Sequence, residues 1–240
     1  MPRPRLRDAV QAHELYPLGQ IPEEYVRRLG AYIVYLLAIG REDMTGDDFG
    51  DAWAWAIGGV HLRSPLGIAD VVYDDRQAWS MKTVKKGNPL TASTVALISG
   101  RCSPDYSYGI TDPHEDVQAT GTAVLGIWNE RVNIARDHYN PVRTVVLVRS
   151  EDLTTFALFE EDAVRYPTNE YTWQENRRGN LKGFREGAQA FTWQPHGSQF
   201  TIHARVPAEA IRFRVRRPEA IPQATILESV GFDDSWVQLL

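Results

Sequence analysis

The sequence predicts an α/β protein whose core is followed by a mostly β C-terminal elaboration. Between residues 47 and 148 the apolar pattern indicates a helix, three strands, a long helix and a strand, in that order. After residue 160, short alternating segments separated by polar turns replace the helical spacing. The 240 residues are 43% hydrophobic and 24% charged, which is typical of a globular chain. We expect the core over residues 1–160 and the elaboration, packed on it, over residues 161–240.

Two helices are expected at the start of the core. Residues 22–40 carry apolar side chains at helical spacing, between Pro22, which suits a first turn, and Gly40, which suits a C-terminal stop. Residues 47–57 begin with two aspartates, whose charge stabilises a helix N-terminus, and are followed by two glycines.

The pattern then changes from helical to alternating. A first strand is expected over residues 59–66, interrupted at Pro65. Residues 68–73 and 79–84 are rich in β-branched and aromatic side chains and flank a short polar turn. We therefore expect these two segments to form a β-hairpin.

The second half of the core combines a loop, a helix and two strands. Turn signals dominate residues 88–114, where we expect a loop with a short helix near residues 91–98. Residues 115–138 carry apolar side chains on one helical face. Residues 143–148 are apolar throughout, as buried strands are, and residues 155–159 are expected to pair with them antiparallel.

The elaboration is expected to be built from short strands. These lie at residues 171–173, 190–193, 199–206 and 210–216. The last of them has an apolar face and a basic face, the latter formed by Arg212, Arg214 and Arg216.

Charge and composition exclude several classes of protein. With 26 Lys and Arg against 31 Asp and Glu, the net charge of −5 excludes a histone-like coat, although a local basic surface can still bind DNA. The sequence has no run of about 18 apolar residues, which a membrane helix needs, and its first five residues do not resemble a secretory signal. Its one cysteine, Cys102, excludes an internal disulfide. We expect a cytoplasmic protein without a membrane partner.

One set of residues in the predicted hairpin can carry chemistry. Asp70 falls in the second strand, and Ser80, Met81 and Lys82 fall in the third. Because side chains alternate along a strand, Ser80 and Lys82 point the same way, and a favourable register brings Asp70 to the same face.

This layout resembles the restriction-endonuclease-like, or PD-(D/E)xK, nuclease superfamily, whose core has the order αβββαβ. In that family an aspartate on the second strand binds Mg²⁺, and the third strand supplies an acidic residue and, two positions later, a lysine near the attacking water. The resemblance assigns the first role to Asp70 and the last to Lys82. Ala69 replaces the family's proline, and Ser80 occupies the acidic position. The resemblance covers the core only.

Phosphodiester hydrolysis needs a cation that neutralises the charge developing on the phosphate and lowers the pKa of water. Mg²⁺ takes oxygen ligands, and Mn²⁺ can substitute for it. On the resemblance, Asp70 and the Met81 carbonyl would bind the metal, Ser80 would bind it weakly or through water, and Lys82 would orient the water or stabilise the transition state.

The carboxylate that Ser80 does not supply has three candidates. We prefer Asp51, because Phe49-Gly-Asp-Ala-Trp53 resembles the family's helix-borne acidic residue. Glu130, on the later helix, and Glu115, near its start, stay open as alternatives.

Several cations are candidates for DNA contacts. They are Lys85 and Lys86 after the third strand, Arg101, and the glycine-containing loop with Arg177, Arg178, Lys182 and Arg185. Trp173 and Trp193, in the elaboration, are candidates for stacking on bases.

These features together predict a Mg²⁺-dependent endonuclease, most simply a type II restriction enzyme that cuts double-stranded DNA. Cleavage of a palindrome calls for two equivalent active sites, and hence for a homodimer. Two alternatives stay open: a repair or structure-specific nuclease, and a catalytically degenerate DNA-binding module on the same fold.

Overall fold

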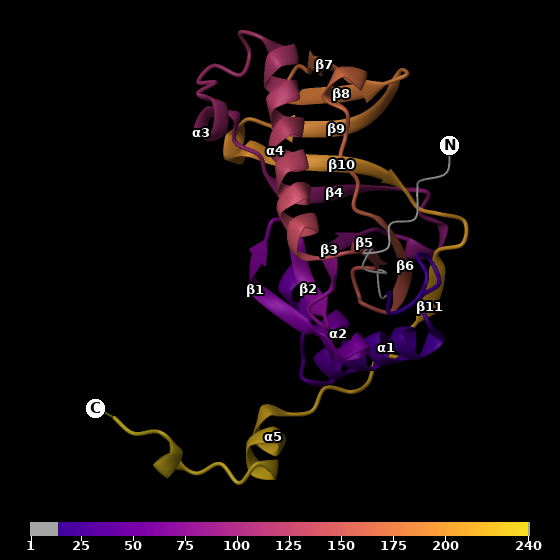
Figure 1. The fold of residues 1–240 in the computed structure, drawn as a ribbon. Helices are drawn as coiled ribbons and strands as arrows, with labels where there is room; N and C mark the ends of the chain where they lie inside the picture. The colour runs from indigo at the N-terminus through magenta and orange to yellow at the C-terminus, as the bar shows by residue number, and fades with distance from the viewer. Residues whose placement is uncertain (1–13, 240) are drawn as a thin grey trace, which may run out of the picture.

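Two β-sheets, joined along the length of one long helix, form the body of the protein (Figure 1). The structure is a computed structural model and describes residues 14–239, so the expectation about the first five residues lies outside it. The chain is mixed α/β, as the sequence predicts. Among residues 14–239, no helix combines the length and the apolar character needed to cross a membrane.

The first sheet has six strands in the spatial order β1-β2-β3-β5-β6-β11. These strands are β1 (Val60–Leu66), β2 (Ala69–Tyr73), β3 (Gln77–Lys85), β5 (Val142–Arg149), β6 (Thr155–Asp162) and β11 (Ile211–Arg214). Strands β3 and β5 run parallel, whereas the other neighbours run antiparallel, so the sheet is mixed.

The second sheet has five antiparallel strands in the order β4-β10-β9-β8-β7. These strands are β4 (Thr94–Arg101), β10 (Gln199–Arg205), β9 (Ala188–Gln194), β8 (Leu181–Arg185) and β7 (Thr172–Glu175). Strand β4 comes from the first half of the chain, while β11 returns to the first sheet. The expected division at residue 160 therefore does not coincide with the division between the sheets.

The helices are α1 (Glu23–Ala38), α2 (Gly46–Ile57), α3 (Pro104–Tyr108), α4 (Val117–His138) and α5 (Gln223–Ser229). Helices α1 and α2 cover one face of the first sheet and α4 covers the other, whereas α3 packs against α4 and α5 lies away from both sheets (Figure 1). Along β3 and β5, Trp79 and Leu147 pack into the core formed with α1 and α2, whereas Ala78 and Val146 pack into the core formed with α4. Helix α4 also covers the inner face of the second sheet (Figure 1).

The predictions of the long helices and of the strand pairs in the core are confirmed. The predicted helices at residues 22–40, 47–57 and 115–138 correspond to α1, α2 and α4. The hairpin of β2 and β3 and the antiparallel pair of β5 and β6 are also present.

Two local predictions are wrong, one is partly right, and one helix was not predicted. The short helix expected near residues 91–98 is strand β4, in which Val95 and Leu97 point inward while their neighbours are exposed. Strand β1 continues through Pro65 because an edge strand tolerates a missing N–H donor, but its pairing with β2 shifts register between His61 and Leu66, so the expected interruption is seen in the pairing. The loop expected over residues 177–185 is a turn followed by strand β8, and α5 was not predicted.

Candidate functional site

A cavity of about 300 Å³ opens where β2, β3 and β4 meet α4 and the start of α2. Its polar lining consists of Asp47, His61, Arg63, Asp70, Ser80, Lys82, Ser99 and Arg131. The main chain of Met81 also borders it. Four residues that the sequence singles out, at positions 70, 80, 81 and 82, therefore lie in one place.

Strand register brings Asp70 to Ser80. Val71 pairs with Trp79 in the antiparallel hairpin, so the preceding Asp70 stands beside Ser80 on the face that looks toward α4. Asp70 Oδ2 accepts a hydrogen bond from the Met81 backbone N–H at 2.7 Å and a longer one from Ser80 Oγ at 3.4 Å. These bonds fix the orientation of the carboxylate without closing it from the cavity.

Lys82 occupies the same face, two positions beyond Ser80. Its Nζ donates to Ser80 Oγ at 2.8 Å and to the Met81 carbonyl at 3.1 Å, and lies 3.9 Å from Asp70 Oδ2. Burial lowers the pKa of Lys82; the Asp70 charge opposes this shift, and the Arg131 charge adds to it. A lysine with a depressed pKa that faces a carboxylate in a cavity is typical of functional sites.

Arg131, on α4, is a cation that the sequence analysis missed. Its guanidinium donates to the carbonyls of Ser99 at 3.2 Å and Gly67 at 3.3 Å. Gly100 has a φ of +100°, and a Cβ there would lie only 2.3 Å from Arg131 Nη1, so glycine makes room for the guanidinium. Nothing in the local sequence of α4 marks this arginine, since its position depends on packing against two distant strands.

The three carboxylates proposed to complement Asp70 do not line the cavity. Asp51 is held by His61 at 2.9 Å and by Arg63 at 2.9 and 3.1 Å, so it contacts two residues of the lining without lining the cavity itself. Glu115 lies exposed in the turn before α4, and Glu130 is exposed and bonded to its helix neighbour Asn133. The preference for Asp51 is therefore corrected.

The structure brings a different aspartate to the cavity. Asp47, in the first turn of α2, is exposed and lines it together with Asp70. The turn is fixed by a capping box in which Thr45 Oγ1 accepts from the Asp48 N–H and the Asp48 carboxylate accepts from the Thr45 N–H. In the sequence, Asp47 carries only the signal of a helix N-terminus, and its place at the cavity depends on how α2 packs beside β2 and β3.

A further carboxylate lies behind Lys82. Register places Ser80 beside Thr144, and Thr144 beside Glu161, in a row across β3, β5 and β6. Glu161 and Lys82 border one small cavity of about 10 Å³. Burial raises the pKa of Glu161, and the sequence analysis did not single this residue out.

The cations proposed for DNA contacts are dispersed. Arg177 and Arg178 are exposed in the turn between β7 and β8, and Arg101 is exposed at the end of β4. Lys86 is half-buried just after β3, and Lys182 is half-buried on β8.

Two of these cations are already paired. Lys85 Nζ lies 2.8 Å from Glu151 and 3.3 Å from Asp43, and Arg185 lies 2.8 Å from Glu170. Because these charges are partly neutralised, Lys85 and Arg185 are weaker candidates for phosphate contacts than the sequence suggests.

The tryptophans proposed for base stacking are core residues. Trp173 and Trp193 are only 6% and 3% exposed and pack with Phe191 and other side chains under α4. Their interpretation as stacking platforms is corrected.

The donor set of the cavity fits a magnesium ion. The Asp70 and Asp47 carboxylates, the Ser80 hydroxyl and the Met81 carbonyl are all oxygen ligands, and Mg²⁺ commonly takes one or two carboxylates with water and phosphate completing its shell. Among residues 14–239, no three His, Cys, Asp or Glu side chains gather into a metal cluster.

Searches against protein-family models, characterised proteins and solved structures found no match to this chain.

Proposed function

We propose that the protein is a Mg²⁺-dependent endonuclease that acts in the cytoplasm and cuts double-stranded DNA, in the manner of a type II restriction enzyme. The observation that carries this proposal is the convergence of Asp70, Ser80 and Lys82, from a β-hairpin, with Arg131 from the opposing helix in one cavity. A carboxylate, a buried amine and a guanidinium around a shared space suit hydrolysis of a phosphodiester.

The arrangement of the first sheet supports the resemblance to the PD-(D/E)xK superfamily. Helix α2 precedes three antiparallel strands, and α4 then leads to β5, which runs parallel to β3. This is the αβββαβ order that the resemblance implies, interrupted by β4 and α3. Asp70 and Lys82 stand on the second and third strands of that order.

Each residue then has a chemical role. Asp70, Asp47 and the Met81 carbonyl would hold Mg²⁺, which supplies charge to neutralise the phosphate and acidify water. Lys82, kept 2.8 Å from Ser80 Oγ, would orient the attacking water or move its proton. Arg131 would donate hydrogen bonds to the phosphate oxygens, on which negative charge grows in the transition state.

The outer face of the second sheet supports DNA as the partner. Because side chains alternate along a strand, one face of the second sheet points away from α4. On β7 to β10 this outer face carries Gln174, Lys182, Thr192, Gln194 and His203. Glutamine amides and threonine hydroxyls match the hydrogen-bonding edges of bases, and lysine matches phosphate or guanine. The outward positions of the five described strands carry no carboxylate.

This face reaches the candidate active site. Ile98, on β4, is 60% exposed on the same outward side and also borders the cavity. A duplex lying on the sheet would therefore place a phosphate near Asp70. A homodimer would supply one such site to each strand of a palindrome.

The proposal is tested by cleavage of unmodified and methylated phage DNA in Mg²⁺, followed by mapping of the fragment ends. We expect discrete fragments from the parent and none from Asp70→Ala, while DNA affinity stays within several-fold. Glu130→Gln is the matched control, an exposed carboxylate on α4 that does not line the cavity and accepts from its helix neighbour Asn133, and it should cut like the parent. Cutting by Asp70→Ala at the parental rate would contradict the proposal.

One observation favours a second candidate, a DNA-binding module on a degenerate nuclease core. Ser80 takes the acidic position, and the described residues supply only Asp47 and Asp70 to the cavity as carboxylates. Binding that persists in chelator, without cleavage in Mg²⁺ or Mn²⁺, would favour this module. Preference for branched or mismatched DNA would instead favour a structure-specific nuclease.

A further inference from the structure

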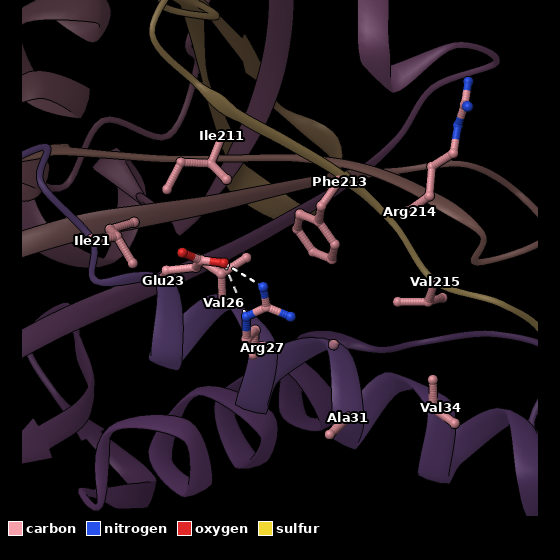
Figure 2. A pocket seen from close by; sticks show the side chains of 11 residues that line it. Ile21, Glu23, Val26, Arg27, Ala31, Val34, Ile211, Phe213, Arg214 and Val215 are labelled. Atoms are coloured by element: carbon pink, nitrogen blue, oxygen red, sulfur yellow. Dashed lines mark hydrogen bonds and ion pairs between the residues drawn. The ribbon is translucent and has the colours of Figure 1, made fainter.

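A second cavity, of about 720 Å³, lies far from the candidate active site, between α1 and β11 (Figure 2). Val26, Ala31 and Val34 form its α1 wall, and Ile211, Phe213 and Val215 form the opposite wall. Figure 2 shows Phe213 pointing into the space above α1. We call this cavity the α1–β11 groove. It is an apolar surface at the edge of the first sheet, where it can receive another chain.

The C-terminal residues of the protein form an arm that leaves the body. At its base the Ile221 N–H donates to the Ala38 carbonyl at 2.7 Å, at the C-terminal end of α1. Beyond this bond α5 and the chain after it project away from both sheets (Figure 1). From Glu219 to Leu239, Ile226 alone is half-buried and the other residues are exposed. We call residues 218–239 the C-terminal arm.

The arm carries apolar side chains that have no partner in the described chain. Leu227, Val230, Phe232, Trp236 and Val237 are all more than one-third exposed, and the rings of Phe232 and Trp236 lie 5.9 Å apart. A contiguous exposed apolar cluster on a projecting segment marks an interaction surface, because leaving it in water is unfavourable.

Charge makes the arm complementary to the groove. Residues 218–239 contain four carboxylates and no Lys or Arg, which gives the arm a net charge of −4. Four arginines lie between residues 212 and 217, on β11 and just after it. Of these, Arg214 borders the groove, as does Arg27, whose guanidinium is paired with Glu23 in the same lining. An acidic, apolar segment fits an apolar groove with basic edges.

The size of the arm also fits. The α1 wall from Glu23 to Val34 is about 16 Å long, and α5 followed by a short turn has comparable length. Phe and Trp each bury about 150–250 Å² when covered, so two arms with their aliphatic neighbours approach the roughly 1,200–2,000 Å² of a stable interface.

The direction of the arm indicates that the groove belongs to a second copy. Pro218 and Pro222 stiffen the base of the arm, and α5 leads away from its own groove (Figure 1). We propose that two copies of this chain form a dimer by exchanging C-terminal arms, so that Phe232 and Trp236 of each copy occupy the α1–β11 groove of the other. Such a reciprocal exchange has twofold symmetry, and it does not depend on the proposed nuclease function.

The first test is the oligomeric state of the full chain by sedimentation velocity. We expect the parent to be a dimer at micromolar concentration, and both Val34→Asp in the groove and Trp236→Asp in the arm to weaken dimerisation by about 100-fold. Tyr35→Asp is the matched control, because Tyr35 is 53% exposed on α1 but does not line the groove. A monomeric parent, or a dimer that neither Val34→Asp nor Trp236→Asp weakens, would overturn the proposal.

The second test identifies the occupant of the groove. A chain carrying both Val34→Cys and Trp236→Cys is treated with a short bismaleimide. The parent is the control, because burial raises the pKa of its Cys102 thiol to about 11 and makes that thiol unreactive. Exchanged arms give covalent dimers on a denaturing gel. A link confined to one chain would show that the arm folds back on its own groove, and no link would show that the arm does not occupy it; either result overturns the exchange.

Discussion

Two clusters of charged residues lie on opposite faces of the first sheet, and they differ in how deeply their charges are buried and how closely they are paired. On the α1 and α2 side, Arg143 and Glu160 are 1% and 0% exposed and form an ion pair at 3.0 Å. On the α4 side, Lys82 and Asp70 are 15% and 23% exposed and stand 3.9 Å apart beside a cavity.

The first cluster is closed by its hydrogen bonds. Glu160 accepts from the Tyr16 hydroxyl at 3.1 Å, from Trp79 Nε1 at 3.3 Å and from the Gly19 N–H at 2.9 Å, while Arg143 also donates to the Tyr16 carbonyl. Every member therefore has protein partners, although Arg143 and Glu160 each border a cavity of their own, of about 510 and 210 Å³. A cluster of this kind stabilises one arrangement of the chain around it.

In the second cluster the polar groups line a cavity, where a ligand could contact them. Lys82 has a depressed pKa, Arg131 donates to the carbonyls of Ser99 and Gly67, and the Asp70 carboxylate faces the cavity. Complete pairing indicates a structural role, and incomplete pairing around a cavity indicates a functional one. The comparison predicts that substitutions in the first cluster change stability and those in the second change activity.

The largest effect on stability is expected at Arg143. Arg143→Met leaves Glu160 buried without its partner and should lower the free energy of unfolding by about 3–5 kcal/mol. The double variant Arg143→Met/Glu160→Leu removes both charges and should lose less. Urea unfolding measures the free energy of unfolding of both variants. An Arg143→Met variant as stable as the parent would contradict the structural role of the first cluster.

A smaller effect, on activity, is expected at Arg131. Arg131→Met removes the donors proposed for the phosphate and should lower the cleavage rate by about 10²-fold to 10³-fold. Arg136→Met is the control, since Arg136 lies on the same helix but pairs with Asp162 at 3.0 Å on the surface. Equal loss in both variants would mean that α4 is perturbed generally rather than at the site.

The smallest effect is expected at Glu161, the neighbour of Glu160 on the opposite face. Burial raises the pKa of Glu161 in the folded protein above the ordinary value of 4.5, which applies to the unfolded chain. The free energy of unfolding therefore falls as pH rises from 4.5 through the folded-state pKa. Glu161→Gln should therefore stabilise the protein at pH 7, and the gain should vanish as pH is lowered below 4.5. Glu160→Gln is the control and should destabilise at pH 7. A Glu161→Gln variant less stable than the parent at pH 7 would contradict this assignment.

The sequence was sufficient to predict those parts of the site that depend on local patterns. Alternation on β3 places Ser80 and Lys82 on one face, and the hairpin turn places Asp70 beside them. Strong periodicity likewise marks α4 and the buried strand β5.

The rest of the site depends on packing between distant segments. Asp47 and Asp51 are one helical turn apart on α2, but Asp47 lines the cavity directly, whereas Asp51 is bonded to His61 and Arg63 of its lining. Arg131 is recognisable only once Gly67 and Ser99 are placed around it. Strand β4 was missed because its pairing partner, β10, lies about a hundred residues later.

Lys82→Met is the most direct test of the central claim, that the α4-side cluster is a catalytic site rather than a structural one. The measurement compares the rate of fragment formation from unmodified double-stranded DNA in Mg²⁺ with the free energy of unfolding of the same preparation. We predict that the variant loses cleavage by about 10²-fold to 10⁴-fold while its free energy of unfolding equals or exceeds that of the parent, because a buried amine with a depressed pKa is removed. A variant that cuts at the parental rate, or that fails to fold, would contradict the account.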